Sequence, residues 1–160
     1  MTCSISVHID QEKGIDTEYP KKYFEDWINE VEYELGSHSL KGISSVSIGL
    51  VSKNTIQDLN KTYRKKDKPT NVLAFASYPG LKESTNSLGD IAICPEVLKH
   101  EATEQFKEEN SHLAHLFIHG ILHLIGFDHE KIAEAKEMEK IEIRILKRLG
   151  IDDPYQIDLI

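Results

Sequence analysis

The segment HGILHLIGFDH, residues 119–129, contains three histidines whose spacing decides how the rest of the chain is interpreted. Residues four apart on a helix share one face, so His119 and His123 can turn their imidazoles toward one ion. Gly126 follows three residues later, and glycine readily adopts the left-handed conformation that ends a helix and turns the chain back. We therefore expect His129 to supply a third ligand, which leaves a coordination position open, as in catalytic zinc sites.

Glycine stands at position 120, where the zinc proteases called metzincins carry glutamate in the pattern H-E-x-x-H-x-x-G-x-x-H. That glutamate is the general base of the protease, so its absence argues against peptide hydrolysis by the same mechanism. Glycine inside a helix costs about 1 kcal/mol relative to alanine. We therefore expect substrate or neighbouring backbone to approach Gly120 closely.

The composition is that of a soluble globular domain with an acidic balance. The chain has 160 residues, 39% hydrophobic and 29% charged, with a net charge of -8, which predicts a single domain over residues 1–160. No apolar run approaches the roughly 20 residues that span a bilayer, and no secretory signal is visible. We expect no membrane partner and a cytoplasmic location. Cys3 and Cys94 are predicted to be buried, reduced thiols.

The hydrophobic periodicity predicts four strands and about five helices. The predicted strands cover residues 5–9, 43–51, 71–77 and 90–94. The predicted helices cover residues 20–35, 95–107, 112–125 and 131–149, with a break at 109–111. A further short helix is predicted to have Ser52 or Asn54 as its cap and to run through Tyr63. This pattern indicates an α+β domain with a small, mainly parallel but mixed four-stranded sheet, packed with about five helices that include a zincin-like metal helix.

A basic cluster follows the predicted helix that ends near Tyr63. Its cations are Lys61, Arg64, Lys65, Lys66 and Lys68, interrupted only by Asp67. Such a cluster can contact phosphate. A solvated helix end and loop is the alternative that composition leaves open.

Two residues near the histidine triplet are candidates for a supporting role. His115 lies one turn before His119 on the same face and can either orient a metal ligand or belong to the polar core. Asp128 can orient an imidazole or cap the final helix. The remaining histidines are expected in the core or at the surface: His112 in the core, and His8, His38 and His100 at the surface.

The same eleven residues resemble the signature H-G-x-L-H-L-x-G-[YF]-D-H of the YbeY family, metal-dependent proteins regarded as endoribonucleases in ribosomal RNA maturation. Further matches to this family are LNKTYRKKDKPTNVLAF at 59–75, LGDI at 88–91 and MEKIEIRILKRLG at 138–150. The resemblance covers about residues 59–150. Two departures are visible, because Asn71 stands where the family usually has aspartate and Ala74 where serine is common.

The resemblance implies one zinc ion bound by His119, His123 and His129, although other transition metals also bind three-histidine sites. It further implies that Arg64 engages RNA. That role is physically reasonable, because a guanidinium can bind a phosphodiester in bidentate fashion as negative charge develops on it. A surface salt bridge is the alternative for Arg64.

The sequence therefore predicts a metal-dependent endoribonuclease that cleaves single-stranded RNA in ribosomal RNA maturation and ribosome quality control. Arg64 would act on the reacting phosphate, and the lysines of the basic cluster would hold the RNA backbone. The expected partners are single-stranded and ribosomal RNA, with ribosomal proteins or a ribosome-associated GTPase as further candidates. Two alternatives stay open: a zinc metalloprotease-like hydrolase, and a non-catalytic ribosome assembly factor.

Overall fold

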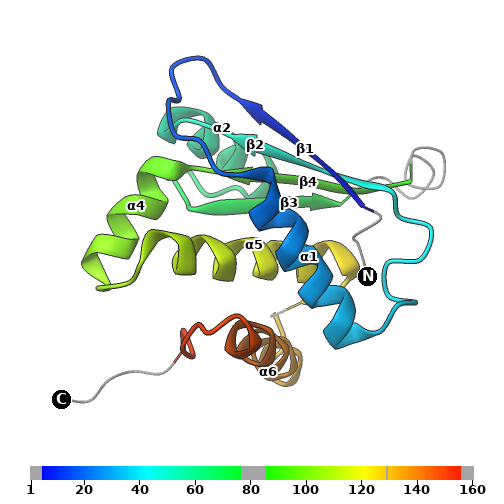
Figure 1. The fold of residues 1–160 in the computed structure, drawn as a ribbon. Helices are drawn as coiled ribbons and strands as arrows, with labels where there is room; N and C mark the ends of the chain where they lie inside the picture. The colour runs from blue at the N-terminus through cyan, green and yellow to red at the C-terminus, as the bar shows by residue number, and fades with distance from the viewer. Residues whose placement is uncertain (1–4, 77–85, 129, 156–160) are drawn as a thin grey trace.

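The computed structural model describes residues 5–76, 86–128 and 130–155. They form a four-stranded sheet and five helices (Figure 1). In chain order the elements are β1 (Ser6–Gln11), α1 (Lys21–Leu35), β2 (Ser45–Leu50), α2 (Lys53–Arg64), β3 (Val72–Ala76), β4 (Ser87–Ile93), α4 (Pro95–Glu104), α5 (Glu109–Ile125) and α6 (Ile132–Arg148). The expected single-domain α+β fold is confirmed.

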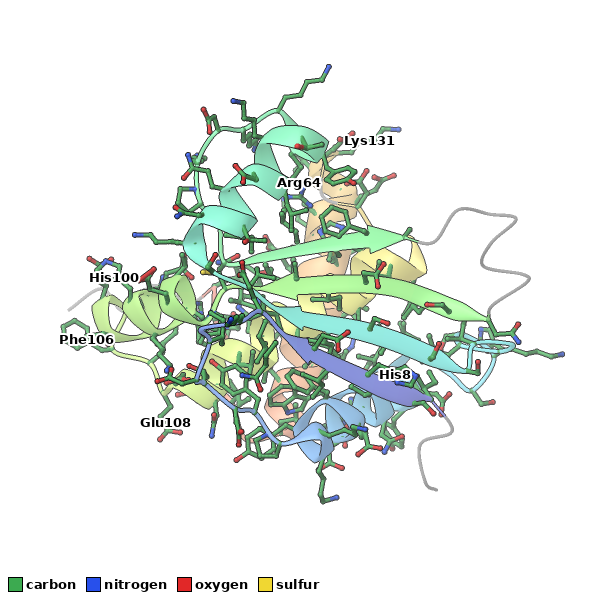
Figure 2. The ribbon with its side chains drawn as sticks, turned by 90° about the horizontal axis from the view of Figure 1, so that it is seen from above. His8, Arg64, His100, Phe106, Glu108 and Lys131 are labelled. Carbon is green, nitrogen blue, oxygen red and sulfur yellow. The ribbon has the colours of Figure 1, made fainter. Side chains whose placement is uncertain are left out.

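The sheet is mixed, with strand order β1-β2-β4-β3. β1 and β2 are parallel, as are β2 and β4, whereas β3 runs antiparallel to β4 at the edge. Figure 2 looks onto this sheet and shows Arg64 beside the β3 edge and His8 on β1 at the opposite edge. The one antiparallel strand thus lies next to the helix that carries the basic cluster.

Alternation along the strands divides the apolar side chains between the two faces of the sheet. One face carries Ile48 and Ile91, which belong to the main core together with α1, α5 and α6. The other face carries Leu73 and Ala92, which pack with Ile56 of α2 in a smaller cluster. Figure 1 shows the resulting layers, with α5 directly under the sheet and α6 farther from it.

Helix α5 is the centre of the molecule, because it is covered on almost all sides. Ten of its residues are buried, and Phe117 packs edge-on against Phe24 of α1 with a ring-centroid distance of 4.9 Å. A helix that is hydrophobic around most of its circumference belongs in the interior. The histidines of α5 are therefore presented from a rigid, buried element.

The helix that delivers Arg64 has well-defined ends. Ser52, not Asn54, is its N-cap, and the Ser52 hydroxyl accepts a hydrogen bond from the backbone N–H of Thr55. At the other end Lys65 adopts a left-handed conformation with φ of 58° and stops the helix. Arg64 is consequently the last helical residue of α2.

Two details of the sequence-based boundaries were wrong. The break between α4 and α5 lies at residues 105–108 rather than at 109–111, and α5 begins at Glu109, three residues before the predicted start. Phe106 has φ of 55° in this connection, and a left-handed phenylalanine has no sequence signature. Strand β4 likewise begins at Ser87 rather than at Asp90.

The smaller expectations are mostly confirmed. Cys94 is a buried free thiol, while Cys3 lies outside the described residues. His112 is buried and the histidines at positions 8, 38 and 100 are exposed. In the described part of the chain, no helix combines the length and the apolar character needed to cross a membrane.

Candidate functional site

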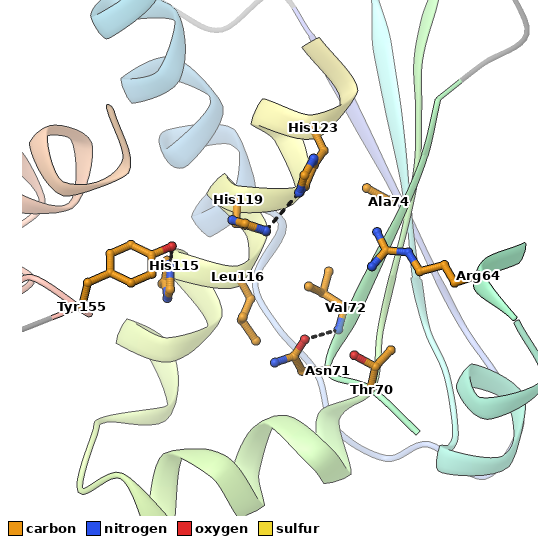
Figure 3. Close-up of a pocket in the computed structure, with 11 residues that line it drawn as sticks. Arg64, Thr70, Asn71, Val72, Ala74, His115, Leu116, His119, His123 and Tyr155 are labelled. Carbon is orange, nitrogen blue, oxygen red and sulfur yellow. Dashed lines mark hydrogen bonds between the residues drawn. The ribbon is translucent and has the colours of Figure 1, made fainter. Parts of the chain in front are cut away.

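A cavity of about 200 Å³ opens between α5, β3, the end of α2 and the chain after α6 (Figure 3). Segments that are far apart in the sequence contribute to it. Its lining residues are Arg64, Thr70, Asn71, Val72, Ala74, His115, Leu116, His119, Gly120, His123 and Tyr155. Four residues that the sequence predicted for the site or its support therefore meet at one cavity: Arg64, His115, His119 and His123.

His119 and His123 lie one turn apart on α5 and point toward each other. Their rings are nearly perpendicular, at 84°, with centroids 4.6 Å apart, and the two Nε2 atoms are separated by 3.0 Å. Both side chains are only partly buried, so the pair is accessible from the cavity. The predicted pairing of these two imidazoles is thus present.

The hydrogen bonds on the far side of each ring determine where the ring protons are. The Nδ1 atom of His119 lies 2.5 Å from Oε1 of Glu142, and Nδ1 of His123 lies 3.0 Å from the backbone carbonyl oxygen of Phe127. A carboxylate and a carbonyl can only accept, so each Nδ1 carries the proton. In the neutral rings both Nε2 atoms then carry lone pairs.

When both rings are neutral, two lone pairs face each other at 3.0 Å, and a cation between them would remove their repulsion. A tetrahedral zinc ion with Zn–N distances of about 2.0–2.1 Å would place two ligand nitrogens about 3.3 Å apart, close to the spacing seen between His119 and His123. The donor chemistry of this pair therefore fits a metal ion.

The third predicted ligand, His129, lies outside the described residues. Within residues 5–76, 86–128 and 130–155, no group of three histidine, cysteine or acidic side chains converges as a metal site. The three-histidine site consequently stays a prediction. The geometry of His119 and His123 supports it.

Glu142 is the main residue that the sequence reasoning missed. It comes from α6, its side chain is fully buried, and it faces His115, His119 and Tyr155. Burial alone would raise the pKa of this carboxyl group, but the donors of the three neighbours outweigh burial and lower the pKa to about 2. Glu142 is therefore an anion held directly behind His119.

A sequence signal for Glu142 did exist. On α6 the residue lies four positions after Met138 and three before Ile145, on the stripe whose apolar members are buried. A charged residue on a buried stripe requires a polar partner. Tyr155 offers no comparable signal, because it follows the last helix in an irregular segment.

His115 lies beside the two candidate ligands and contacts the residues behind them. Its Nε2 atom lies 3.1 Å from the Tyr155 hydroxyl and 3.8 Å from the Glu142 carboxylate. The Tyr155 hydroxyl in turn donates to Glu142, and burial together with that anion raises the pKa of Tyr155. His115, Tyr155 and Glu142 form one hydrogen-bonded group behind His119.

Asn71 is held rigidly at the rim of the cavity. Its side-chain oxygen accepts from the Val72 N–H at 2.7 Å, and its amide nitrogen donates to Glu101 at 2.9 Å. The same Glu101 oxygen lies 2.9 Å from Nε2 of buried His112. An amide at position 71 can donate to Glu101, whereas the aspartate usual in the family would need a different partner.

Arg64 extends from the end of α2 toward the two histidines (Figure 3). Among the described residues it makes no salt bridge of 4.0 Å or less, unlike Lys61, whose ammonium lies 3.9 Å from Asp67. The alternative of a surface salt bridge is therefore not supported for Arg64. The lysines at 61, 65, 66 and 68 are exposed, and none of them lines the cavity.

A second hollow of about 310 Å³ continues past His123 toward the end of α5. It shares Arg64, Ala74 and His123 with the first cavity and also reaches Asp128. Asp128 accepts a hydrogen bond from the backbone N–H of Glu130 at 3.3 Å. It does not cap α6, because the N-cap of that helix is Lys131 and no side chain caps it.

Gly120 packs against a side chain of the sheet and not, as far as the nearest atoms show, against neighbouring backbone. A Cβ atom at this position would lie 3.3 Å from Cδ1 and 3.7 Å from Cγ1 of Ile91 on β4. The glycine lets α5 lie close to β4, which brings His119 near the sheet edge. The expectation of backbone contact was wrong in this respect.

Together, the fold and the cavity define a small single-domain α+β protein with paired histidines on its central helix. The chain belongs to the YbeY family: the family model described as Endoribonuclease YbeY matches residues 6–150. This match confirms the resemblance seen in the sequence and extends it over most of the chain.

Individual relatives support the same assignment. An Endoribonuclease YbeY from Colwellia psychrerythraea is 49% identical over 135 residues, covering 84% of this chain and 86% of the relative. One from Alkalilimnicola ehrlichii is 45% identical over 141 residues, covering 87% and 83%. The solution structure of TM1509 from Thermotoga maritima is similar with a TM-score of 0.55 and 25% identity, covering 95% of this chain and all of that one.

Proposed function

We propose that this chain cleaves single-stranded RNA with the help of one metal ion, most simply zinc, held by His119, His123 and His129. As a member of the YbeY family, the chain is an endoribonuclease, a hydrolase of RNA phosphodiester bonds with a role in ribosomal RNA processing. The observation that carries the metal proposal is the pair of Nε2 atoms that face each other at 3.0 Å while each Nδ1 atom faces an oxygen acceptor.

The ion, when bound, would supply a Lewis acid for the phosphoryl oxygen of the scissile phosphate. The remaining chemistry belongs to the protein. Arg64 reaches the same cavity as His119 and His123, and its planar guanidinium can donate two parallel hydrogen bonds to phosphate oxygens. These hydrogen bonds strengthen as charge develops during attack, so Arg64 stabilises the transition state more than the bound RNA.

Single strands fit this site better than duplexes. The cavity is small and lies between α5 and the edge strand β3, and the neighbouring hollow continues it past His123. A single strand can splay its bases and enter such a trough, whereas an A-form duplex presents a rigid, wide minor groove. The exposed lysines at 61, 65, 66 and 68 lie outside the cavity and would hold flanking phosphates.

The wider cellular assignments follow from the same proposal. The chain has a net charge of -8 although it includes the basic cluster, and this acidic balance suits docking to basic ribosomal proteins or to a ribosome-associated GTPase as well as to RNA. We accordingly propose a cytoplasmic protein that acts on ribosomal RNA, including its quality control.

The decisive test compares RNA cleavage by four proteins, each loaded with one equivalent of zinc. The wild type should cut an unstructured RNA, leave the matched duplex and casein intact, and lose activity with a chelator. Arg64→Gln should be about 100-fold slower or worse, the usual cost of losing one donor to developing charge, and His123→Ala should be inactive.

Lys53→Gln is the matched control, because it removes an exposed cation from the opposite end of α2 and should cleave at the wild-type rate. Full cleavage by Arg64→Gln would remove Arg64 from the mechanism. Metal-replete wild type that leaves RNA intact but cuts casein would establish the metalloprotease alternative. A protein that cuts neither, although its loss impairs ribosome maturation, would be an assembly factor.

A further inference from the structure

We propose that Glu142 and Tyr155 are positioning residues that couple the chain after α6, residues 150–155, to the affinity of the site for its metal ion. The inference rests on the proposed metal site at His119 and His123. It assigns a role to two residues that are not proposed ligands of the ion.

Glu142 fixes the orientation and the tautomer of His119. Its carboxylate is fully buried, and Oε1 lies 2.5 Å from Nδ1 of His119. Because a carboxylate only accepts, the proton stays on Nδ1 and the Nε2 lone pair stays directed into the cavity. A flip of the ring would put Cδ2 against Glu142 and Cε1 in the place of Nε2, and would so remove the ligand.

The two imidazoles are held by unequal partners. His119 donates to a buried anion, whereas His123 donates to the neutral carbonyl of Phe127. A carboxylate that accepts a hydrogen bond from an imidazole makes that imidazole a stronger electron donor to a cation. Glu142 is also a buried negative charge, and a divalent cation nearby would compensate it. The affinity of the pair for a metal therefore depends on Glu142 more than on the Phe127 carbonyl.

Tyr155 completes the surroundings of Glu142. Its hydroxyl donates to Oε2 of Glu142 and accepts from Nε2 of His115 at 3.1 Å, while its ring packs edge-on against His115 with centroids 5.3 Å apart. The backbone N–H of Tyr155 donates to Asp153 at 2.8 Å, which shapes the segment around the tyrosine. The second carboxylate oxygen thus accepts a hydrogen bond from the chain after α6.

Coupling between the segment and the metal follows by thermodynamic linkage. If docking of Tyr155 keeps Glu142 in place and thereby strengthens metal binding, metal binding must stabilise the docked segment by the same free energy. The metal should therefore protect residues 151–155 although none of them is a proposed ligand.

The first experiment measures zinc affinity by competition with a chromophoric chelator, without RNA. Glu142→Gln keeps the shape and a hydrogen-bond acceptor but loses the charge, and we expect its affinity to fall about 10–100-fold, as for other residues that orient metal ligands. Tyr155→Phe should weaken binding less, by about tenfold or below. Glu137→Gln, an exposed residue on the same helix, should bind zinc as the wild type does.

The second experiment measures amide hydrogen exchange of residues 151–155 with and without zinc. Zinc should slow exchange in the wild type and in Glu137→Gln, and should have a smaller effect in Glu142→Gln and Tyr155→Phe at matched zinc saturation. Tyr155→Phe keeps the test valid if Glu142→Gln does not fold, because it removes only one hydroxyl.

Unchanged zinc affinity in both Glu142→Gln and Tyr155→Phe would overturn the inference, and so would exchange that does not respond to zinc in the wild type. A wild type that binds no zinc would overturn it together with the metal proposal. A wild type that binds zinc, shows the coupling and cuts no RNA would leave this inference standing while refuting the proposed nuclease mechanism.

Discussion

The Nε2 atoms of His119 and His123 face each other at 3.0 Å, and the Nδ1 atom of each ring faces an oxygen acceptor. When both rings are neutral, this arrangement brings two nitrogen lone pairs together and favours a cation between them. The pair is therefore the part of the structure where a metal ion should have the largest effect on stability.

We expect zinc to raise the melting temperature of the wild type. Saturation at about 100 times the dissociation constant corresponds to about 2.7 kcal/mol of added stability. His123→Ala should lose the zinc-dependent shift in differential scanning calorimetry, whereas His100→Ala, an exposed histidine on α4, should keep it. An equal zinc-dependent shift in all three proteins would place the binding site elsewhere.

Gly120 should tolerate alanine but not a larger residue. The Cβ of alanine would lie 3.3 Å from the flexible end of Ile91, and a small movement of that side chain combined with better helix propensity should leave stability within about 1 kcal/mol of the wild type. Gly120→Leu would force α5 away from β4 and should cost about 1–3 kcal/mol. Urea unfolding of both variants checks this, and a stable Gly120→Leu protein would contradict the packing argument.

His112 should make the fold sensitive to mild acid. Burial lowers the pKa of His112, and hydrogen bonding to Glu101 opposes this only in part. The folded state thus binds the proton less readily than the unfolded state, whose histidine pKa is about 6.5. The contribution to stability is complete above that value and is lost as the pH falls from there through the lowered pKa of the folded state.

The corresponding measurement is the free energy of unfolding from pH 7.5 to pH 5. His112→Gln can still donate to Glu101 but does not titrate, so its curve should be flatter than that of the wild type, by at most about 1.4 kcal/mol per pH unit. His100→Gln should keep the wild-type slope. Parallel curves for wild type and His112→Gln would show that His112 does not contribute.

Arg148 should stabilise the contact between α1 and α6. Its guanidinium donates to Glu34 at 2.6 Å and to Glu30 at 2.9 Å, and lies 4.8 Å from the ring centre of Tyr33. Because one arginine joins several partners, Arg148→Ala should cost about 1 kcal/mol, more than an ordinary exposed pair. Lys147→Ala, its exposed neighbour, should change stability by less than about 0.5 kcal/mol. The difference should shrink in about 1 M salt.

The elements of the fold were predictable where one face is strongly apolar. Phe24, Trp27, Ile28 and Val31 recur at helical spacing and are all buried on α1. The break between α4 and α5 was misplaced because it depends on the left-handed conformation of Phe106, which tertiary structure imposes and local propensity does not reveal. The order of the strands and the pairing of β3 with β4 depend on contacts between distant segments, which the local pattern of apolar residues does not specify.

The site was predictable only as far as it is local in sequence. The contact between His119 and His123 follows from one turn of helix, and Arg64 was found through the family signature. The contact between His119 and Glu142 spans 23 residues and depends on how α6 packs against α5. Tyr155 joins that group only after the chain has left α6. The spacing of residues along the sequence does not predict such contacts between different elements.

The burial of α5 has a consequence for how this protein loses its function. The two imidazoles project from the helix whose side chains fill the interior, so they cannot swing apart in a local fluctuation that leaves the rest intact. The amide hydrogens of residues 116–124 should exchange only when the whole protein unfolds. A substitution that creates a cavity in the core under the sheet should also shift the positions of His119 and His123. A substitution that loosens the packing of α5 should therefore reduce both the stability of the protein and its affinity for the metal ion.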